Sequence, residues 1–210
     1  MVDLIPAGVI LAGGRSRRMG GKNKALLPLA GKPLLRHVID RVSPQVAELY
    51  LSVEQPSDAM AAFGLPQIMD PEPDAGPLAG LMTVLQKMDS KHEWLLLAPC
   101  DAPFIPRDLA VRLLECALSL ALPGAIVRYR SEAQPTFSIW NRCLLPRLEQ
   151  AVVGEKMTGF KQFLRVTELA VLDWPESDPS PFFNINDQDA LRYAGRLLDS
   201  ENGVQDPCSA

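Results

Sequence analysis

Short apolar runs alternate with helix-like segments along the first 130 residues, and this alternation limits the possible folds more than any other feature of the chain. The runs are nearly free of polar residues and lie at 7–12, 49–53, 66–69, 94–98 and 125–127. Such runs are typical of strands buried on both faces. Proline stands near the start of several of the helical segments between them, which we predict at 33–42, 57–63, 77–88 and 107–120. The alternation predicts an α/β fold with a three-layer, doubly wound, mostly parallel sheet.

The pattern becomes less regular after Gln134. We predict strands at 135–140 and 168–173, helices at 141–153 and 159–164, and a last helix from about Asp187. The segment "DWPESDPSP" (173–181) is predicted to be a surface loop. These elements form a single domain over 1–198, and the polar remainder, 199–210, is predicted to be a disordered tail.

Charge and cysteine content narrow the class of protein. A formal net charge of −4 over 210 residues argues against a surface built for nucleic acid or for anionic membrane. The four cysteines stand apart without a CxxC pair, so we expect reduced thiols and a cytoplasmic protein rather than a zinc site or a disulfide framework. No apolar run approaches the roughly 20 residues of a membrane helix, and the apolar start lacks a basic region before it, so we predict neither a membrane span nor a signal peptide.

The segment "LAGGRSRRMGGKNKALL" (11–27) places four glycines and five cations directly after the first predicted strand. Glycines let backbone N–H groups converge on an anion, and flanking cations neutralise it, so a phosphate site is the functional interpretation. The alternative is a tight turn followed by a solvated loop, and Arg15, Arg17 and Lys22 individually are expected to face solvent. The spacing matches neither a P-loop nor a dinucleotide fingerprint.

Two further strands end in an aspartate. Asp101 follows the run 94–98 and therefore lies at the carboxyl edge of the predicted sheet, where open α/β folds bind ligands. There it could hold Mg²⁺ if phosphates and water complete the coordination, or it could simply terminate the strand. Asp70 ends another strand, and "GPLAG" (76–80) opens a helix with a turn that could lie against a base or merely connect two elements. Cys100 is expected to be a small buried residue.

Taken together and in this order, "LAGG", "RMGG", "NKALL", "GKPLLRHV", "GPLAG", "PCDAPFIP" and "FFNIN" resemble the molybdenum cofactor guanylyltransferases, the MobA family of the nucleotidyltransferase superfamily. The resemblance covers residues 7–195. It implies a Rossmann-like nucleotidyltransferase fold and the transfer of GMP from Mg·GTP to molybdopterin carrying molybdenum, with release of pyrophosphate. Nucleotidyl transfer needs mainly positioning and charge neutralisation, which one metal ion and a few cations can supply.

The resemblance also implies residue roles. It makes Asp101, Lys24 and Arg18 the catalytic residues, with Asp101 as the ligand of Mg²⁺ or Mn²⁺. The nucleotide-binding residues that it implies are Leu11, Ala12, Gly13, Gly14, Lys24, Asp70 and Asp101. Asn184 and Asn186 are implied to bind the acceptor. Residues 7–130 thus become the nucleotide-binding part and 131–198 the acceptor-binding part, with GTP, molybdopterin or molybdenum cofactor, and cofactor-insertion proteins or apo-molybdoenzymes as partners.

Some positions depart from the family pattern or allow another interpretation. Asn23 stands where the family usually has aspartate, and Ser52 where it often has asparagine, so no nucleotide contact is expected of Ser52. Asn186 or Asp187 could instead be the N-cap of the last helix. Three other functions stay open: a cytidylyltransferase of the same pterin, a sugar-phosphate nucleotidyltransferase, and a noncatalytic nucleotide-binding cofactor chaperone, which would be expected to lack the metal aspartate.

Overall fold

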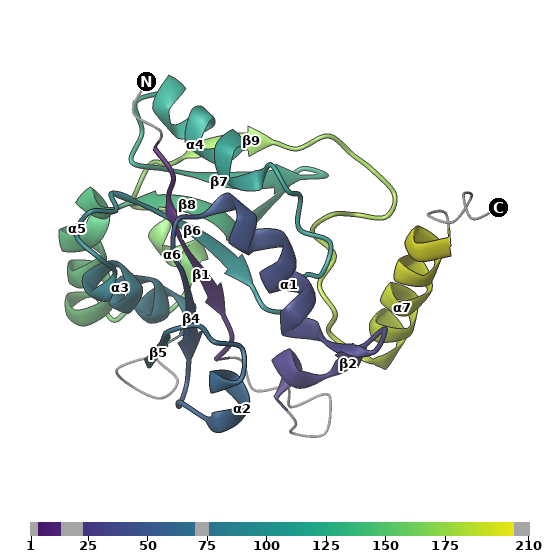
Figure 1. The fold of residues 1–210 in the computed structure, drawn as a ribbon. Coiled ribbons are helices and arrows are strands. Elements are labelled where there is room, and N and C mark those ends of the chain that lie inside the picture. The colour runs from purple at the N-terminus through teal and green to yellow at the C-terminus, as the bar shows by residue number, and fades with distance from the viewer. Residues whose placement is uncertain (1–3, 14–22, 70–75, 204–210) are drawn as a thin grey trace.

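A seven-stranded sheet forms the centre of the computed structural model, which describes residues 4–13, 23–69 and 76–203 (Figure 1). The strand order across this sheet is β5-β4-β1-β6-β8-β7-β9. Its strands are β1 (Ala7–Leu11), β4 (Leu49–Val53), β5 (Gln67–Met69), β6 (Trp94–Pro99), β7 (Gly124–Tyr129), β8 (Glu132–Asn141) and β9 (Ala170–Asp173). A separate hairpin, which the apolar pattern did not predict, pairs β2 (Pro28–Leu29) with β3 (Lys32–Pro33).

Most strand pairs of the sheet are parallel. The four strands β5, β4, β1 and β6 run parallel to one another, and so do β7 and β9. Only β8 runs against its neighbours, β6 and β7, because a tight turn with positive φ at Arg130 and Ser131 joins it directly to β7. The predicted mostly parallel α/β sheet is confirmed.

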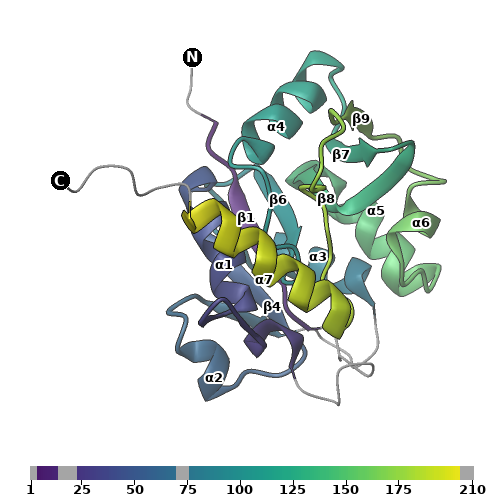
Figure 2. The same cartoon turned by 90° about the vertical axis from the view of Figure 1, so that its right-hand side faces the viewer.

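Helices cover both faces of the sheet and give three layers (Figures 1 and 2). The helices are α1 (Leu34–Val42), α2 (Asp58–Ala61), α3 (Pro77–Lys87), α4 (Leu109–Ser119), α5 (Leu145–Glu149), α6 (Phe160–Phe163) and α7 (Gln188–Gly203). One buried apolar cluster joins α1 and α4 to the sheet, and a second joins α3, α5 and α6 to its other face. Strands β1, β4, β6 and β7 each supply side chains to both clusters, which is why these strands read as nearly continuous apolar runs rather than alternating ones.

The last helix, α7, lies apart from these two layers and packs beside α1 and β2 (Figure 2). It continues to Gly203, and so extends into the segment 199–210 for which the sequence predicts a disordered tail. The buried side chains of Ala194 and Leu198 dock the helix, and adding further residues to a helix that has already formed costs little even when they are polar. Residues 204–210 lie outside the described part of the chain. Every helix in the described part is too short or too polar to cross a bilayer.

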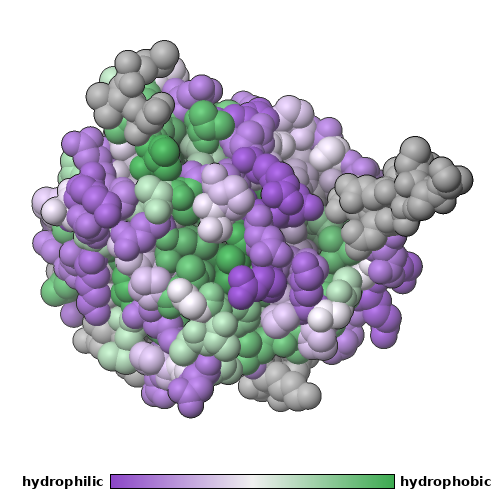
Figure 3. Space-filling view, viewed as in Figure 1, coloured by the Kyte–Doolittle hydropathy of each residue, from purple (hydrophilic) through white to green (hydrophobic). Residues whose placement is uncertain are grey.

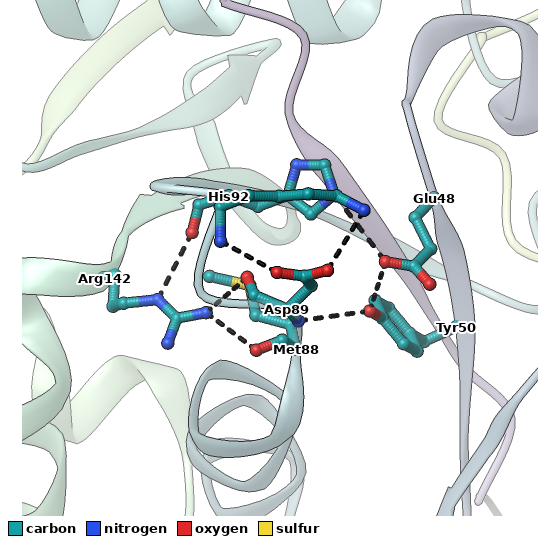
Figure 4. Close-up of polar contacts among 7 residues, drawn as sticks. Glu48, Tyr50, Met88, Asp89, His92 and Arg142 are labelled. Carbon is teal, nitrogen blue, oxygen red and sulfur yellow. Dashed lines mark hydrogen bonds and ion pairs between the residues drawn. The ribbon is translucent and has the colours of Figure 1, made fainter.

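A polar network lies at the amino edge of the sheet, where β4 and β6 begin (Figure 4). Arg142, just after β8, donates to the carbonyl oxygens of Met88 and Asp89, both at 2.8 Å, at the end of α3. The Tyr50 hydroxyl donates to Glu48 at 2.6 Å and accepts from the Asp89 N–H at 3.4 Å, and burial raises the pKa of Tyr50 to about 12. These bonds close the connection between α3 and β6 at this edge.

The hydropathy of the face shown in Figure 3 does not single out a site. On the face shown in Figure 3, hydrophobic and hydrophilic residues are interspersed. Single exposed hydrophobic residues such as Val111 and Leu118 on α4 are normal for a globular domain.

Candidate functional site

The carboxyl ends of β1 and β6 lie side by side at the point where the strand order changes direction. Leu11 is paired with Pro99, and the Cys100 N–H donates to the Leu11 carbonyl oxygen at 3.2 Å. In open α/β sheets this is the position at which ligands bind. The chain leaves the sheet here toward the glycine-rich segment on one strand and toward Asp101 on the other.

Three residues that the resemblance implicated meet at this edge. The Lys24 ammonium forms an ion pair with the Asp101 carboxylate and also donates to the Asn186 amide oxygen at 2.8 Å. The Lys24 and Asp101 side chains are only 13% and 17% exposed, so solvent screens their attraction less than it would screen a surface pair. Segments far apart in the sequence therefore place a cation, an anion and an amide in one cluster.

Lys24 is held in place by a short 3₁₀ helix, Lys24–Leu26, which begins just after Asn23. The Asn23 side-chain oxygen accepts a hydrogen bond from the Ala25 N–H at 3.1 Å, as an N-cap does. Ala25 is fully buried, so this turn is anchored on the core while Lys24 projects into the site. The departure from the usual aspartate at position 23 is thereby accounted for, because an amide oxygen accepts the same bond.

Asp101 is fixed through its own backbone. Its carbonyl oxygen accepts from the Ile185 N–H at 2.9 Å, and Ile185 is fully buried in the apolar cluster that includes Leu29 and Leu34. Cys100, next to Asp101, is buried as expected, and burial together with the Asp101 charge raises the pKa of its thiol to about 12. The Cys100 thiol is therefore protonated at neutral pH when no ligand is bound.

The two asparagines of the "FFNIN" segment differ in their surroundings. Asn186 is exposed and contacts Lys24, whereas the side-chain oxygen of Asn184 is buried and has no hydrogen-bond partner in the described part of the chain. The carboxylate of Asp187 accepts from the Ala190 N–H at 2.8 Å. The capping role that the sequence left open between positions 186 and 187 therefore belongs to Asp187.

The remaining predicted residues lie in or next to segments that the structure leaves out. Ala12 is buried, and its N–H already donates to the Ser52 carbonyl oxygen at 2.8 Å, so a nucleotide contact there has to use another group. Leu11 and Gly13 are half-buried at the end of β1. The other predicted residues, Gly14, Arg18 and Asp70, lie outside the described residues.

A metal ion at this edge would have Asp101 as its protein ligand. Residues 4–13, 23–69 and 76–203 contain no group of three or more histidine, cysteine or acidic side chains able to hold a metal ion. The Asp101 carboxylate nevertheless already faces a cation, the Lys24 ammonium. One carboxylate fits Mg²⁺ or Mn²⁺ only where phosphate oxygens and water supply the other ligands, which is the arrangement expected of a metal that arrives with a nucleotide.

The role of Gly76 at the start of α3 could not be predicted from the sequence. Its φ is +80°, and a Cβ atom there would lie 2.4 Å from the carbonyl oxygen of Thr158. The same carbonyl accepts from the Leu78 N–H at 3.3 Å, so the two segments touch through their backbones. Glycine is thus required by a close contact with a distant part of the chain, and no local pattern marks that contact.

The family model of the MobA-like NTP transferase domain matches residues 8–172. The chain belongs to this family. A relative from Rhodopseudomonas palustris (strain BisB5), named molybdenum cofactor guanylyltransferase, is 36% identical to this MobA-like chain over 90% of the chain and 92% of its own length. A second with the same name, from Cupriavidus necator, is 37% identical over 88% of the chain and 94% of its own length.

A solved structure supports the fold. The molybdopterin-guanine dinucleotide biosynthesis protein A from Archaeoglobus fulgidus superposes with a TM-score of 0.74 and 21% sequence identity, covering 92% of this MobA-like chain and 99% of the other. At this identity the likeness shows the fold alone. The nucleotidyltransferase fold implied by the sequence is confirmed, and the sequence relatives show the family.

Proposed function

We propose that this MobA-like NTP transferase transfers GMP from GTP to the phosphate of molybdopterin-bound molybdenum cofactor. The observation that carries the proposal is the meeting of Lys24, Asp101 and Asn186 at the carboxyl edge of β1 and β6. In the reaction an oxygen of the acceptor phosphate bonds to the α-phosphorus of GTP while the bond from that phosphorus to the bridging oxygen of the β-phosphate breaks. The products are the guanine dinucleotide form of the cofactor and pyrophosphate.

Positioning and charge neutralisation are the tasks of the protein in such a transfer. Lys24 carries the positive charge of the site, and we assign it to the GTP phosphates once they are bound. We assign Arg18, in the same glycine-rich segment, as a second cation for the GTP phosphates. The residues that we assign to the rest of the nucleotide are Leu11, Ala12, Gly13, Gly14 and Asp70, with Ala12 contributing a group other than its N–H.

We assign Asp101 as the ligand of Mg²⁺ or Mn²⁺. When bound, the metal ion would neutralise phosphate charge and hold the pyrophosphate leaving group. Without ligands, Lys24 compensates the Asp101 charge and holds the carboxylate in the orientation of their ion pair. The backbone bond from Ile185 to Asp101 keeps that orientation.

We assign the acceptor to the side of Asn186 and Asn184, in the part of the chain from 131 to 198. Asn186 lies one hydrogen bond from Lys24, so an acceptor phosphate bound to its amide would reach the phosphates of the nucleotide. The enzyme would work in the cytoplasm, where GTP is present, and would hand its product to cofactor-insertion proteins or to apo-molybdoenzymes.

A nucleotide panel tests the proposal. The protein is incubated with Mg²⁺, molybdopterin carrying molybdenum, and either GTP or CTP, and both nucleotide binding and dinucleotide product are measured. We expect product from GTP, and kcat/KM for CTP at least about 100-fold lower, because the wrong base leaves buried hydrogen-bonding groups unpaired. Comparable values would favour the cytidylyltransferase alternative, and GTP binding without product would favour a cofactor chaperone.

A further inference from the structure

We infer that Phe182 is a positioning residue for the acceptor, because its ring holds the segment that carries Asn186 against the sheet. The inference rests on the proposed function. The segment is the strap, residues 174–187, which joins β9 to α7 along the carboxyl edge of the sheet (Figures 1 and 2). Asn186 lies near the end of the strap, where it accepts from Lys24.

The start of the strap is tied to β7. The Trp174 N–H donates to the Arg128 carbonyl oxygen at 2.9 Å, and the Tyr129 hydroxyl donates to the Ser177 carbonyl oxygen at 2.7 Å. The Arg112 guanidinium of α4 lies 3.8 Å from the centre of the Trp174 ring, a cation–π contact. These contacts fix the first residues of the strap but lie far along the chain from Asn186.

Phe182 is the next anchor. Its ring is only 5% exposed and meets three other rings edge-on, with centroid distances of 4.8 Å to Phe137, 5.4 Å to Trp174 and 5.6 Å to Tyr129. Edge-to-face contacts of this kind have a preferred geometry, so they fix the orientation of a ring as well as its burial. An aliphatic side chain would fill part of the space without fixing the strap in the same way.

The segment between Phe182 and Ile185 stays packed although it contains a buried polar atom without a hydrogen bond. The Asn184 side-chain oxygen, between these two anchors, is buried without a hydrogen-bond partner in the described structure, and an unpaired buried oxygen favours movement toward water. The ring of Phe182 on one side and the buried side chain of Ile185 on the other oppose that movement. Without the ring, the strap can relax toward solvent, and the amide oxygen of Asn186 shifts away from Lys24.

Two matched aromatic substitutions test the inference. Phe182→Leu removes the ring of the strap, and Phe163→Leu removes a fully buried ring from the cluster on the opposite face of the sheet. Both are expected to lower the melting temperature. Only Phe182→Leu is expected to raise the acceptor KM, by about tenfold, with the Kd for GTP unchanged within about twofold. If Phe182→Leu does not fold, the unbranched Phe182→Met is used in the same comparison.

A double-mutant cycle shows whether Phe182 acts through Asn186. In an Asn186→Ala background, Phe182→Leu should have little further effect on the acceptor KM, because the group that it positions is gone. Additive effects of the two substitutions would overturn the inference. So would equal acceptor KM values for Phe182→Leu, Phe163→Leu and wild type.

Crystal structures of the two variants give a readout that needs no activity. The contact between Asn186 and Lys24 should lengthen beyond about 3.5 Å in Phe182→Leu and stay intact in Phe163→Leu. An unchanged contact in Phe182→Leu would contradict the positioning role. Wild-type protein that makes no dinucleotide would instead contradict the proposed function, so the two failures are distinguishable.

Discussion

Lys24 joins the polar groups of the site, because its ammonium contacts both the predicted metal ligand and the predicted acceptor amide. A cation placed between a carboxylate and an amide can turn toward phosphates when they arrive, since phosphate oxygens offer it more negative charge than an amide does. We therefore assign each residue a separate role: Lys24 binds the phosphates, Asp101 binds the metal ion and Asn186 binds the acceptor.

Replacing the carboxylate of Asp101 should abolish transfer without unfolding the protein. Asp101→Asn keeps the shape of the side chain and the backbone bond to Ile185, but an amide lacks the anionic oxygen that Mg²⁺ prefers. We expect kcat to fall at least about 100-fold while the circular dichroism spectrum is retained. A variant with near wild-type product formation would show that Asp101 is not the metal ligand.

Removing the ammonium of Lys24 should weaken the binding of GTP more than the binding of GMP. Lys24→Ala loses a charge-assisted contact to the outer phosphates, which corresponds to about 10-fold or more in the Kd for GTP. GMP lacks those phosphates, so calorimetric titration should show a smaller loss for it. Lys32→Ala serves as the control, because Lys32 is an exposed lysine that contacts a different acidic residue: its Nζ lies 3.8 Å from Oδ2 of Asp40. Equal losses for GTP and GMP would refute the assignment.

Neighbouring substitutions separate acceptor binding from helix capping. Asn186→Ala should raise the acceptor KM about tenfold and leave the melting temperature and the Kd for GTP nearly unchanged. Asp187→Ala should instead lower stability by about 0.5–2 kcal/mol, because it removes the N-cap of α7. If Asn186→Ala instead lowered stability and Asp187→Ala raised the acceptor KM, Asn186 would have only a structural role.

At the scale of elements, the start of α3 depends on Gly76. Gly76→Ala should lower the free energy of unfolding by about 1–3 kcal/mol, since φ is positive and the new Cβ would meet the Thr158 carbonyl. Gly195→Ala, in the interior of α7 with open space around it, should raise the same free energy by about 0.5–1 kcal/mol. Urea denaturation of both variants checks the pair, and a neutral Gly76→Ala would contradict the close backbone contact.

Local patterns predicted most elements because burial and periodicity are local properties. The runs that became β1, β4, β5, β6 and β7 are short and mostly apolar, and Pro77 opens α3 as the sequence indicated. The place of β8 between β6 and β7 could not be predicted, because pairing order depends on contacts between distant segments. The extent of α7 was missed for the same reason, since docking and not composition keeps it helical.

The candidate site was predictable only in part. Position at the end of a strand was enough to place Asp101 at the ligand-binding edge, and the family resemblance was needed to bring in Lys24 and Asn186. The hydrogen bond from Ile185 to Asp101 had no signal in the sequence, because backbone donors are common to almost all residues.

At the scale of the whole molecule, the two edges of the sheet have different tasks. The amino edge is closed by the network around Arg142 and Tyr50, whereas the carboxyl edge gathers side chains from the first and last parts of the chain (Figures 1 and 4). In the proposed function, the nucleotide-binding and acceptor-binding parts meet at Lys24, and we expect the transferred phosphate to lie at this junction.

Transfer of the α-phosphate is measured most directly with GTP labelled at either the α or the γ position. Purified protein is incubated with Mg²⁺, molybdopterin carrying molybdenum and each labelled GTP, with Asp101→Asn as the inactive control. We predict that the α label enters a pterin dinucleotide, that the γ label appears in an equal amount of pyrophosphate, and that the control forms neither. Release of free GMP or GDP without a pterin product, or no pterin labelling at all by the wild-type protein, would contradict the proposed guanylyl transfer.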